Sequence, residues 1–179
     1  MNPAPMKKRI LLVDDDSGVR QMLMRLLTLE DYHVLPAANG EEALQICATN
    51  EVDLVLLDLN LPKQSGWDIF ERLTTDNPLL PFIIITARPN QLFLALGAGA
   101  GALLEKPLDF PELLRTMKSL LAESPEVRLA RMAGNPTEFH YRPKTTFTEE
   151  SGPHRTGTLA RHKPDKVKAH HRTMVGPKT

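Results

Sequence analysis

The chain has 179 residues, and its 22 Lys and Arg residues balance its 22 Asp and Glu residues. This length gives room for one domain of about 120 residues with an extension, or for one larger domain. The single cysteine excludes an internal disulfide, and no apolar run is long enough to span a membrane. We therefore expect a reduced, soluble, cytoplasmic protein without a secretory signal segment and without membrane insertion.

The balanced total charge hides an acidic front and a basic back. Residues 1–121 hold 11 Lys and Arg against 16 Asp and Glu, a net charge of −5. Residues 122–179 hold 11 against 6, a net charge of +5, together with five of the six histidines. Such asymmetry is typical of a folded domain followed by a tail that is solvated or binds an acidic partner.

The front of the chain begins with two predicted strand-helix units. A short apolar run at residues 10–13 ends in three aspartates, and either Asp16 or Ser17 can cap a following helix. A weaker strand at residues 33–37 precedes a second helix, whose apolar face includes Cys47. We interpret this cysteine as a core residue, because no cationic residue lies near it in the sequence.

The third predicted strand is the apolar run Leu54-Val55-Leu56-Leu57. Four consecutive apolar residues are typical of a strand buried on both faces, as in parallel sheets covered by helices. The strand stops at Asp58, and Gly66 helps to shape the loop behind it. A helix at about residues 65–76 follows and ends at Asn77, which precedes a proline.

The fourth predicted strand, residues 82–85, is the most β-prone run and ends in Thr86. Beyond it, residues 90–104 contain no charged residue. We place a fourth helix and a fifth strand, at about residues 102–104, in this stretch. That strand runs directly into Glu105 and Lys106. A segment without charge is either buried in the domain or leaves an apolar surface that contacts a partner.

A last core helix begins at the capping-box-like pair Asp109 and Glu112 and carries an apolar stripe that ends at Leu121. Five strands alternating with five helices predict a compact α/β sandwich. Past this point Ser124 can cap one more helix, which Gly134 and the residues after it end.

These patterns divide the chain into three parts. We predict a flexible lead at residues 1–6, a folded domain at residues 7–122, and a basic, histidine-containing tail at residues 123–179. The apolar residues of the tail are sparse and follow neither helical nor strand spacing. We expect the tail to be mostly disordered, because so little apolar area cannot offset the entropy of ordering it.

Four predicted strands end in polar residues, and the carboxyl ends of parallel strands meet at one edge of a sheet. These residues are Asp14, Asp15, Asp58, Thr86 and Lys106. Each has an ordinary explanation by itself, as a helix cap, a turn, a strand residue or a solvated charge. Together they predict a pocket, because clustered carboxylates repel one another without a cation, and hard oxygen ligands favour Mg²⁺. The nucleophile is then Asp58, since aspartate can form an aspartyl-phosphate.

The order of these motifs closely resembles the receiver domain of two-component response regulators, in particular stand-alone receivers of the chemotaxis type. The motifs are Val-Asp-Asp, Asp58-Leu-Asn-Leu-Pro with Gly66, Ile-Ile-Thr86-Ala and Lys106-Pro107. The resemblance covers about residues 9–121. It implies a flavodoxin-like, doubly wound, five-stranded parallel sheet of order 2-1-3-4-5 with five helices.

The resemblance also implies a role for each pocket residue. Asp58 accepts a phosphoryl group from a sensor histidine kinase, a phosphotransfer protein or a small phosphodonor. Asp15 and Asp58 bind Mg²⁺ directly, Asp14 does so largely through water, and Asn60 supplies its main-chain carbonyl. The remaining phosphoryl contacts come from Thr86 and Lys106, and the bond between Lys106 and Pro107 is cis.

Three departures from the family fall on the surface that such proteins commonly use for output. Leu103 stands where an aromatic residue usually turns inward on activation. The spacing between Thr86 and Lys106 is about two residues short, and the fourth helix is uncharged. We predict that the apolar surface of residues 90–104 contacts a downstream protein or a second copy of the chain.

Our leading interpretation is a phosphorylation-dependent signalling domain rather than an enzyme, with at most Mg²⁺-dependent self-phosphorylation and self-dephosphorylation. One alternative is a DNA-binding regulator whose basic tail contacts phosphates. The tail lacks a helix-turn-helix pattern and zinc-ligand spacing, so we do not expect nucleic acid to be the partner. Another alternative is a scaffold that signals without phosphate, which would not need the complete pocket.

Overall fold

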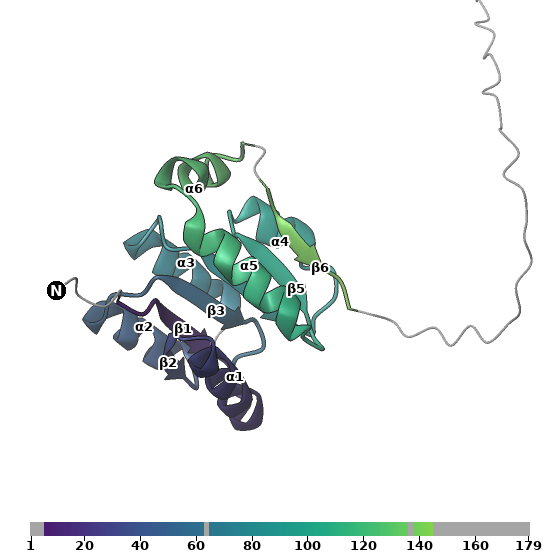
Figure 1. The fold of residues 1–179 in the computed structure, drawn as a ribbon. Helices are drawn as coiled ribbons and strands as arrows, with labels where there is room; N and C mark the ends of the chain where they lie inside the picture. Colours follow the sequence, from purple (N-terminus) through teal and green to yellow (C-terminus); the bar gives the residue numbers. More distant parts are fainter. Residues whose placement is uncertain (1–5, 63–64, 136–137, 145–179) are drawn as a thin grey trace, which may run out of the picture. The chain divides into compact units, whose positions relative to one another are not determined.

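The computed structural model describes residues 6–62, 65–135 and 138–144. These residues form one parallel sheet of six strands in the order β2-β1-β3-β4-β5-β6, with helices on both faces (Figure 1). The strands are β1 (Arg9–Val13), β2 (His33–Ala37), β3 (Leu54–Asp58), β4 (Phe82–Thr86), β5 (Ala102–Glu105) and β6 (His140–Arg142). The predicted flavodoxin-like order 2-1-3-4-5 is therefore confirmed, and the sheet has one more strand than predicted.

Six helices connect or follow these strands. They are α1 (Ser17–Leu29), α2 (Gly40–Thr49), α3 (Gly66–Asp76), α4 (Leu92–Gly97), α5 (Phe110–Ala122) and α6 (Pro125–Met132). Helices α2, α3 and α4 pack on one face of the sheet, and α1 and α5 pack on the other. None of the helices in the described part of the chain is long and apolar enough to cross a membrane.

The core consists of two apolar layers, one on each face of the sheet. Successive strand residues point to opposite faces, so each strand contributes to both layers. Strands β3 and β4 are buried along their whole length, as their uninterrupted apolar runs predicted. Because these central strands cannot shift without exposing apolar side chains, their carboxyl ends are held in a fixed register.

Helix caps position the loops at the carboxyl edge of the sheet. The carboxylate of Asp16, and not the hydroxyl of Ser17, caps α1 by accepting hydrogen bonds from the main-chain N–H groups of Gly18 and Val19. Ser65 caps α3 within a capping box, and Asp109 caps α5. Such caps contribute about 1 kcal/mol each and make the chain leave each strand and enter each helix at a defined residue.

Helix α6 is the additional helix that the sequence analysis expected after Ser124, whereas strand β6 was not predicted. Helix α6 is docked, because Arg128 donates hydrogen bonds to the main-chain oxygens of Leu79 and Leu120, each at 3.1 Å. The largely buried side chains of Arg131 and Glu123 form an ion pair. Ordered structure therefore continues past the boundary predicted at residue 122.

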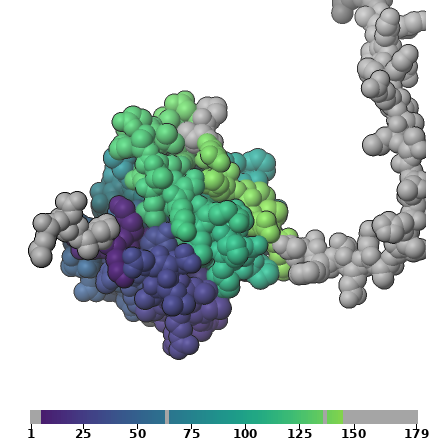
Figure 2. Space-filling model, in the orientation of Figure 1, coloured from purple at the N-terminus to yellow at the C-terminus, as the bar shows by residue number. Residues whose placement is uncertain are grey.

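Strand β6 completes this added structure by pairing in parallel with β5. Figure 2 shows the yellow-green side chains of β6 beside the green and teal side chains of α5, in one continuous surface. The remainder of the predicted tail, residues 145–179, and residues 1–5 of the predicted lead lie outside the described residues.

Candidate functional site

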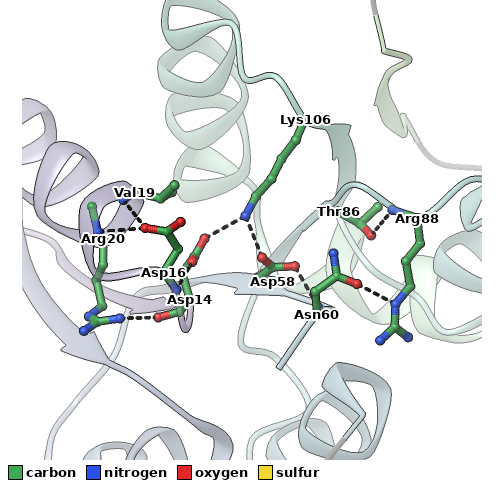
Figure 3. A network of polar contacts seen from close by, with 10 residues as sticks. Asp14, Asp16, Val19, Arg20, Asp58, Asn60, Thr86, Arg88 and Lys106 are labelled. Carbon is green, nitrogen blue, oxygen red and sulfur yellow. Dashed lines mark hydrogen bonds and ion pairs between the residues drawn. The ribbon is translucent and has the colours of Figure 1, made fainter. Parts of the chain in front are cut away.

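The polar residues that end the strands lie together at the carboxyl edge of the sheet (Figure 3). Asp14 follows β1, Asp58 ends β3, Thr86 ends β4 and Lys106 follows β5. The order of strands reverses between β1 and β3, and doubly wound sheets bind their ligands in the crevice at such a switch point. The sequence-predicted residues are thus brought together at the place where this fold forms a site.

Lys106 links two buried carboxylates. Its Nζ lies 2.6 Å from Asp58 Oδ2 and 2.9 Å from Asp14 Oδ2. Asp14 and Asp58 are 1% and 2% exposed, respectively. Burying carboxylates is costly unless they are paired, so the single ammonium group is needed to hold this arrangement.

The charges at this site influence one another. Burial raises the pKa of Asp14, and the hydrogen bond and charge of Lys106 oppose that rise only in part. For Lys106, burial acts to lower the pKa, but the hydrogen bonds to Asp58 and Asp14 outweigh it, and the pKa is raised. The lysine is therefore held as an ammonium ion beside more negative charge than it can balance.

Asp15 adds a third carboxylate at the rim. Asp14, Asp15 and Asp58 each offer an oxygen within 4.8 Å of the other two, and Asp15 is exposed. Oxygen ligands at this separation fit a hard divalent cation that keeps some of its water. The neighbouring Asp16 is engaged elsewhere, since the N–H groups of Val19 and Gly18 lower its pKa by hydrogen bonding.

The loop after β3 fixes the second oxygen of the central carboxylate. The main-chain N–H of Asn60 donates to Asp58 Oδ1 at 2.8 Å. Behind this turn, a Cβ atom at Gly66 would come within 2.5 Å of Leu59 Cα and 2.8 Å of the Asp58 main-chain oxygen. Only glycine allows α3 to approach the loop so closely, which explains why a glycine follows this strand.

Thr86 is completely buried, and its hydroxyl accepts a hydrogen bond from the main-chain N–H of Arg88 at 2.9 Å. The guanidinium of Arg88 donates to Asn60 Oδ1 at 2.5 Å and joins the loops after β3 and β4. Across the pocket, Arg20 donates to the main-chain oxygen of Asp14 at 2.6 Å. Sequence analysis missed both arginines, because an isolated arginine in a loop or helix has no local pattern that points to a site.

The bond between Lys106 and Pro107 is cis, as the resemblance implied. A separate hollow of about 810 Å³ lies at the opposite ends of the strands and is lined partly by Lys8, Asp53 and Arg128. Asp53 precedes β3 whereas Asp58 ends it, so this hollow is not the carboxylate site.

A family model described as the response regulator receiver domain matches residues 10–118. The chain belongs to this receiver family. Receiver domains are signalling modules of two-component systems and are not classical enzymes, so membership confirms the resemblance on which the sequence analysis relied.

Curated relatives of this receiver include response regulators named MprA. That of Mycobacterium sp. (strain KMS) is 40% identical over 118 residues, which are 65% of this chain and 51% of the relative. That of Mycobacterium bovis (strain BCG / Pasteur 1173P2) is 37% identical over 131 residues, which are 72% of this chain and 57% of the relative. The chain thus matches only about half the length of these relatives.

Solved structures of similar receivers share the fold over almost their whole length. A CheY-like receiver domain protein from Methanospirillum hungatei JF-1 is 31% identical with a TM-score of 0.62, covering 65% of this chain and 94% of that one. The response regulator TrrA from Thermotoga maritima, solved in complex with Mg²⁺-BeF, is 33% identical with a TM-score of 0.59. That comparison covers 63% of this chain and 98% of TrrA.

Proposed function

We propose that this receiver domain accepts a phosphoryl group on Asp58 and passes the signal to a protein partner through a conformational switch. The observation that carries the proposal is the ammonium group of Lys106 between the buried carboxylates of Asp58 and Asp14, with Asp15 at the rim. A core designed only for stability would avoid this cluster, because apolar residues of similar size usually pack at lower cost.

The proposed donor is a phosphohistidine of a sensor histidine kinase or of a phosphotransfer protein, or a small phosphodonor. A carboxylate oxygen of Asp58 attacks phosphorus, the bond from phosphorus to the donor nitrogen breaks, and the leaving imidazole takes up a proton. The product is an acyl phosphate on Asp58. In this step Lys106 moves from Asp58 Oδ2 to a phosphoryl oxygen, and the Thr86 hydroxyl donates to another.

The residues that would hold Mg²⁺ are Asp14, Asp15 and Asp58, with the main-chain carbonyl of Asn60. A bound Mg²⁺ supplies positive charge that neutralises the phosphoryl oxygens during transfer. Support comes from the three oxygen ligands within 4.8 Å of one another and from TrrA, which was solved with Mg²⁺ and a beryllium fluoride group.

The proposed output surface is the apolar part of α4. Phe93 is 84% exposed, Leu94 57% and Leu96 43%, whereas Ala95 is buried and Leu92 packs against the core. This distribution supports the prediction that residues 90–104 contact a partner or a second copy, because a short helix rarely presents three large apolar side chains to water without a function.

The pocket does not bear on two predictions of the sequence analysis, namely the preference for a protein partner over DNA and the cytoplasmic location. Most of the basic residues of the tail lie in residues 145–179, outside the described residues. The preference for a protein partner over nucleic acid therefore stays a prediction. The cytoplasmic location stays one as well. A scaffold that signals without phosphate is disfavoured by the pocket itself, since its paired charges have no other evident use.

Intact mass after incubation with Mg²⁺ and acetyl phosphate tests the proposal. We expect a gain of one phosphate, which disappears in Asp58→Asn and in the presence of EDTA. Asp31→Asn is a matched control, because Asp31 is an exposed residue with a positive φ that asparagine also tolerates. Equal uptake of acid-labile phosphate by Asp58→Asn and by the wild type would show that the nucleophile is assigned wrongly.

A further inference from the structure

The edge of the sheet at β5 is covered by a segment of the same chain. Residues 138–144, here called the strap, contain β6, which pairs in parallel with β5. In register, Ala102 lies opposite His140, Leu103 opposite Tyr141 and Leu104 opposite Arg142. Without the strap, β5 would present unpaired main-chain groups to other chains.

One carboxylate holds the strap at its middle residue and at its last residue. The Tyr141 hydroxyl donates to Glu105 Oε1 at 3.0 Å, and the main-chain N–H of Lys144 donates to Glu105 Oε2 at 2.8 Å. Both oxygens of Glu105 are therefore occupied by the strap. The bond to Glu105 also raises the pKa of the Tyr141 hydroxyl.

The remaining contacts of the strap are modest. His140 Nε2 lies 3.2 Å from the Ser119 hydroxyl, and Arg142 lies 3.4 Å from the carboxylate of Asp109. Phe139 is the one apolar anchor among the described strap residues, and it packs against the core layer that contains Leu103. A three-residue edge strand with exposed polar contacts opens at a small free-energy cost, so small displacements of β5 can release it.

The residue that holds the strap is also adjacent to the phosphorylation site. Glu105 directly precedes Lys106, and it lies opposite Thr86 in the pairing of β4 with β5. The main-chain N–H of Lys106 donates to the Thr86 carbonyl at 2.8 Å. The proposed function places Lys106 and Thr86 on the phosphoryl group. Glu105 is next to Lys106 along the chain and opposite Thr86 across the sheet.

We propose that phosphorylation of Asp58 releases the strap from β5, and that in the unphosphorylated state the strap covers this edge against other chains. The inference rests on the proposed function. Phosphorylation draws the Lys106 ammonium away from Asp58 Oδ2 and the Thr86 hydroxyl away from the Arg88 N–H. Both movements act on the carboxyl end of β5, and they displace Glu105 from the position in which it binds Tyr141 and Lys144.

Phosphorylation also weakens the contact between Phe139 of the strap and the core. When Thr86 moves toward the pocket, it leaves space behind it, and Leu103 is the β5 residue on the same face that can fill that space. Leu103 belongs to the apolar layer against which Phe139 packs, so a shift of Leu103 disturbs the layer that supports Phe139. Released, the strap leaves the N–H and C=O groups of β5 free to pair with an extended segment of a partner.

Amide hydrogen exchange on the full chain, with and without Mg²⁺ and beryllofluoride, tests release directly. We expect exchange in residues 140–142 to become faster by about fivefold or more on activation, the usual range for coupled sites. Strand β2, at the opposite edge of the sheet, is the internal control and keeps its rate. Unchanged or slower exchange of β6 in beryllofluoride-bound protein would overturn the inference.

Thermodynamic reciprocity supplies a second test. If activation weakens the strap, then weakening the strap must strengthen binding of beryllofluoride. We expect Tyr141→Phe to bind beryllofluoride about threefold more tightly than wild type, because its hydroxyl bond to Glu105 is lost. The matched control is Tyr32→Phe, a change of the other tyrosine, which lies in the core layer beneath α1 and α5.

The fluorescence of Trp67 reports the titration, since this single tryptophan lies in the first turn of α3, behind the pocket loop, and donates to Gln91. Equal affinities for Tyr141→Phe and Tyr32→Phe would contradict coupling. Phosphate uptake from acetyl phosphate separates the two proposals. If the protein takes up phosphate but the strap is not released, the strap inference is wrong and the proposed function stands. If Asp58 takes up no phosphate, both proposals are wrong.

Discussion

At the scale of single residues, the pocket is defined by an imbalance of charge. Lys106 contacts the carboxylates of Asp14 and Asp58, and Asp15 stands beside them. The ammonium group lies between two carboxylates that the proposed function assigns to phosphoryl transfer and Mg²⁺ binding. Under that proposal the Lys106 side chain stabilises the resting state and moves during the reaction.

Replacing Lys106 by alanine should leave the affinity for Mg²⁺ unchanged or raise it by about threefold or more, because one positive charge near three carboxylates is removed. Titration of Trp67 fluorescence with Mg²⁺ measures this affinity. Lys118→Ala, a change of an exposed lysine on α5, serves as the control. A clearly weaker affinity in folded Lys106→Ala protein would contradict the pocket as described.

A second residue-scale prediction concerns Cys47, which packs against the core and is free. Burial raises the pKa of its thiol from an ordinary value of 9.0 to about 11. Only the thiolate reacts with iodoacetamide, so at pH 8.5 alkylation should be about 100-fold slower than for a free cysteine. The rate should keep rising about tenfold per pH unit up to about pH 11, where it levels off, and guanidinium chloride should abolish the difference. Rapid alkylation of the native protein at pH 8.5 would show that Cys47 is accessible as thiolate.

At the scale of elements, α4 combines a buried side with an exposed apolar side. Its one turn and a half buries Ala95 and part of Leu92 while Phe93 faces solvent. The N-terminal end is held by a hydrogen bond from Trp67 Nε1 to the side chain of Gln91 at 3.0 Å. The helix is thus anchored on α3, with its apolar surface available to a partner.

Phe93→Glu should therefore fold with a free energy of unfolding within about 0.5 kcal/mol of wild type, as for other exposed positions. The matched variant Leu92→Glu should cost about 2 kcal/mol or more, since it places a charge against the core. Urea unfolding measures both. Light scattering with beryllofluoride then tests whether Phe93→Glu prevents self-association, and unfolding of Phe93→Glu would show that this residue belongs to the core.

At the scale of the whole molecule, the receiver fold has been extended by a helix and a strand. Helix α6 returns the chain to the amino-terminal end of β5, where Met132 lies near Gly99, and β6 then runs parallel to β5. The contacts of Arg128 and the ion pair of Arg131 with Glu123 fix this connection. We therefore expect residues past the predicted boundary at 122 to contribute to stability.

Ending the chain after residue 122 should lower Tm by roughly 5–10 °C, through loss of these contacts and of the β6 pairing. Ending it after residue 144 should leave Tm unchanged, because residues 145–179 contain few apolar groups with which to pack. Differential scanning calorimetry on the two truncated chains and the full chain measures both effects. An equal Tm for all three would mean that α6 and β6 add no stability.

Much of the fold follows from local sequence. The apolar runs of β3 and β4 predict buried parallel strands. Because the carboxyl ends of parallel strands meet at one edge, the sequence also predicts that the polar residues at those ends lie together there, namely Asp14, Asp58, Thr86 and Lys106. These features depend on a few consecutive residues and on a sheet order that the family resemblance supplied, so no long-range contact had to be known. The roles of these residues in phosphoryl transfer and Mg²⁺ binding stay predictions.

Tertiary structure decided what local patterns leave open. The sequence allowed Asp16 or Ser17 as the cap of α1, and the structure selects Asp16, whose backbone is extended and whose side chain accepts from the N–H groups of Gly18 and Val19. Residues 138–144 have too few apolar groups to predict a strand. Residues 140–142 form one because they pair with β5, and Glu105, 36 and 39 residues away in sequence, accepts hydrogen bonds from Tyr141 and Lys144. Contacts between segments so far apart carry no signal in either segment alone, because each depends on where the rest of the sheet places its partner.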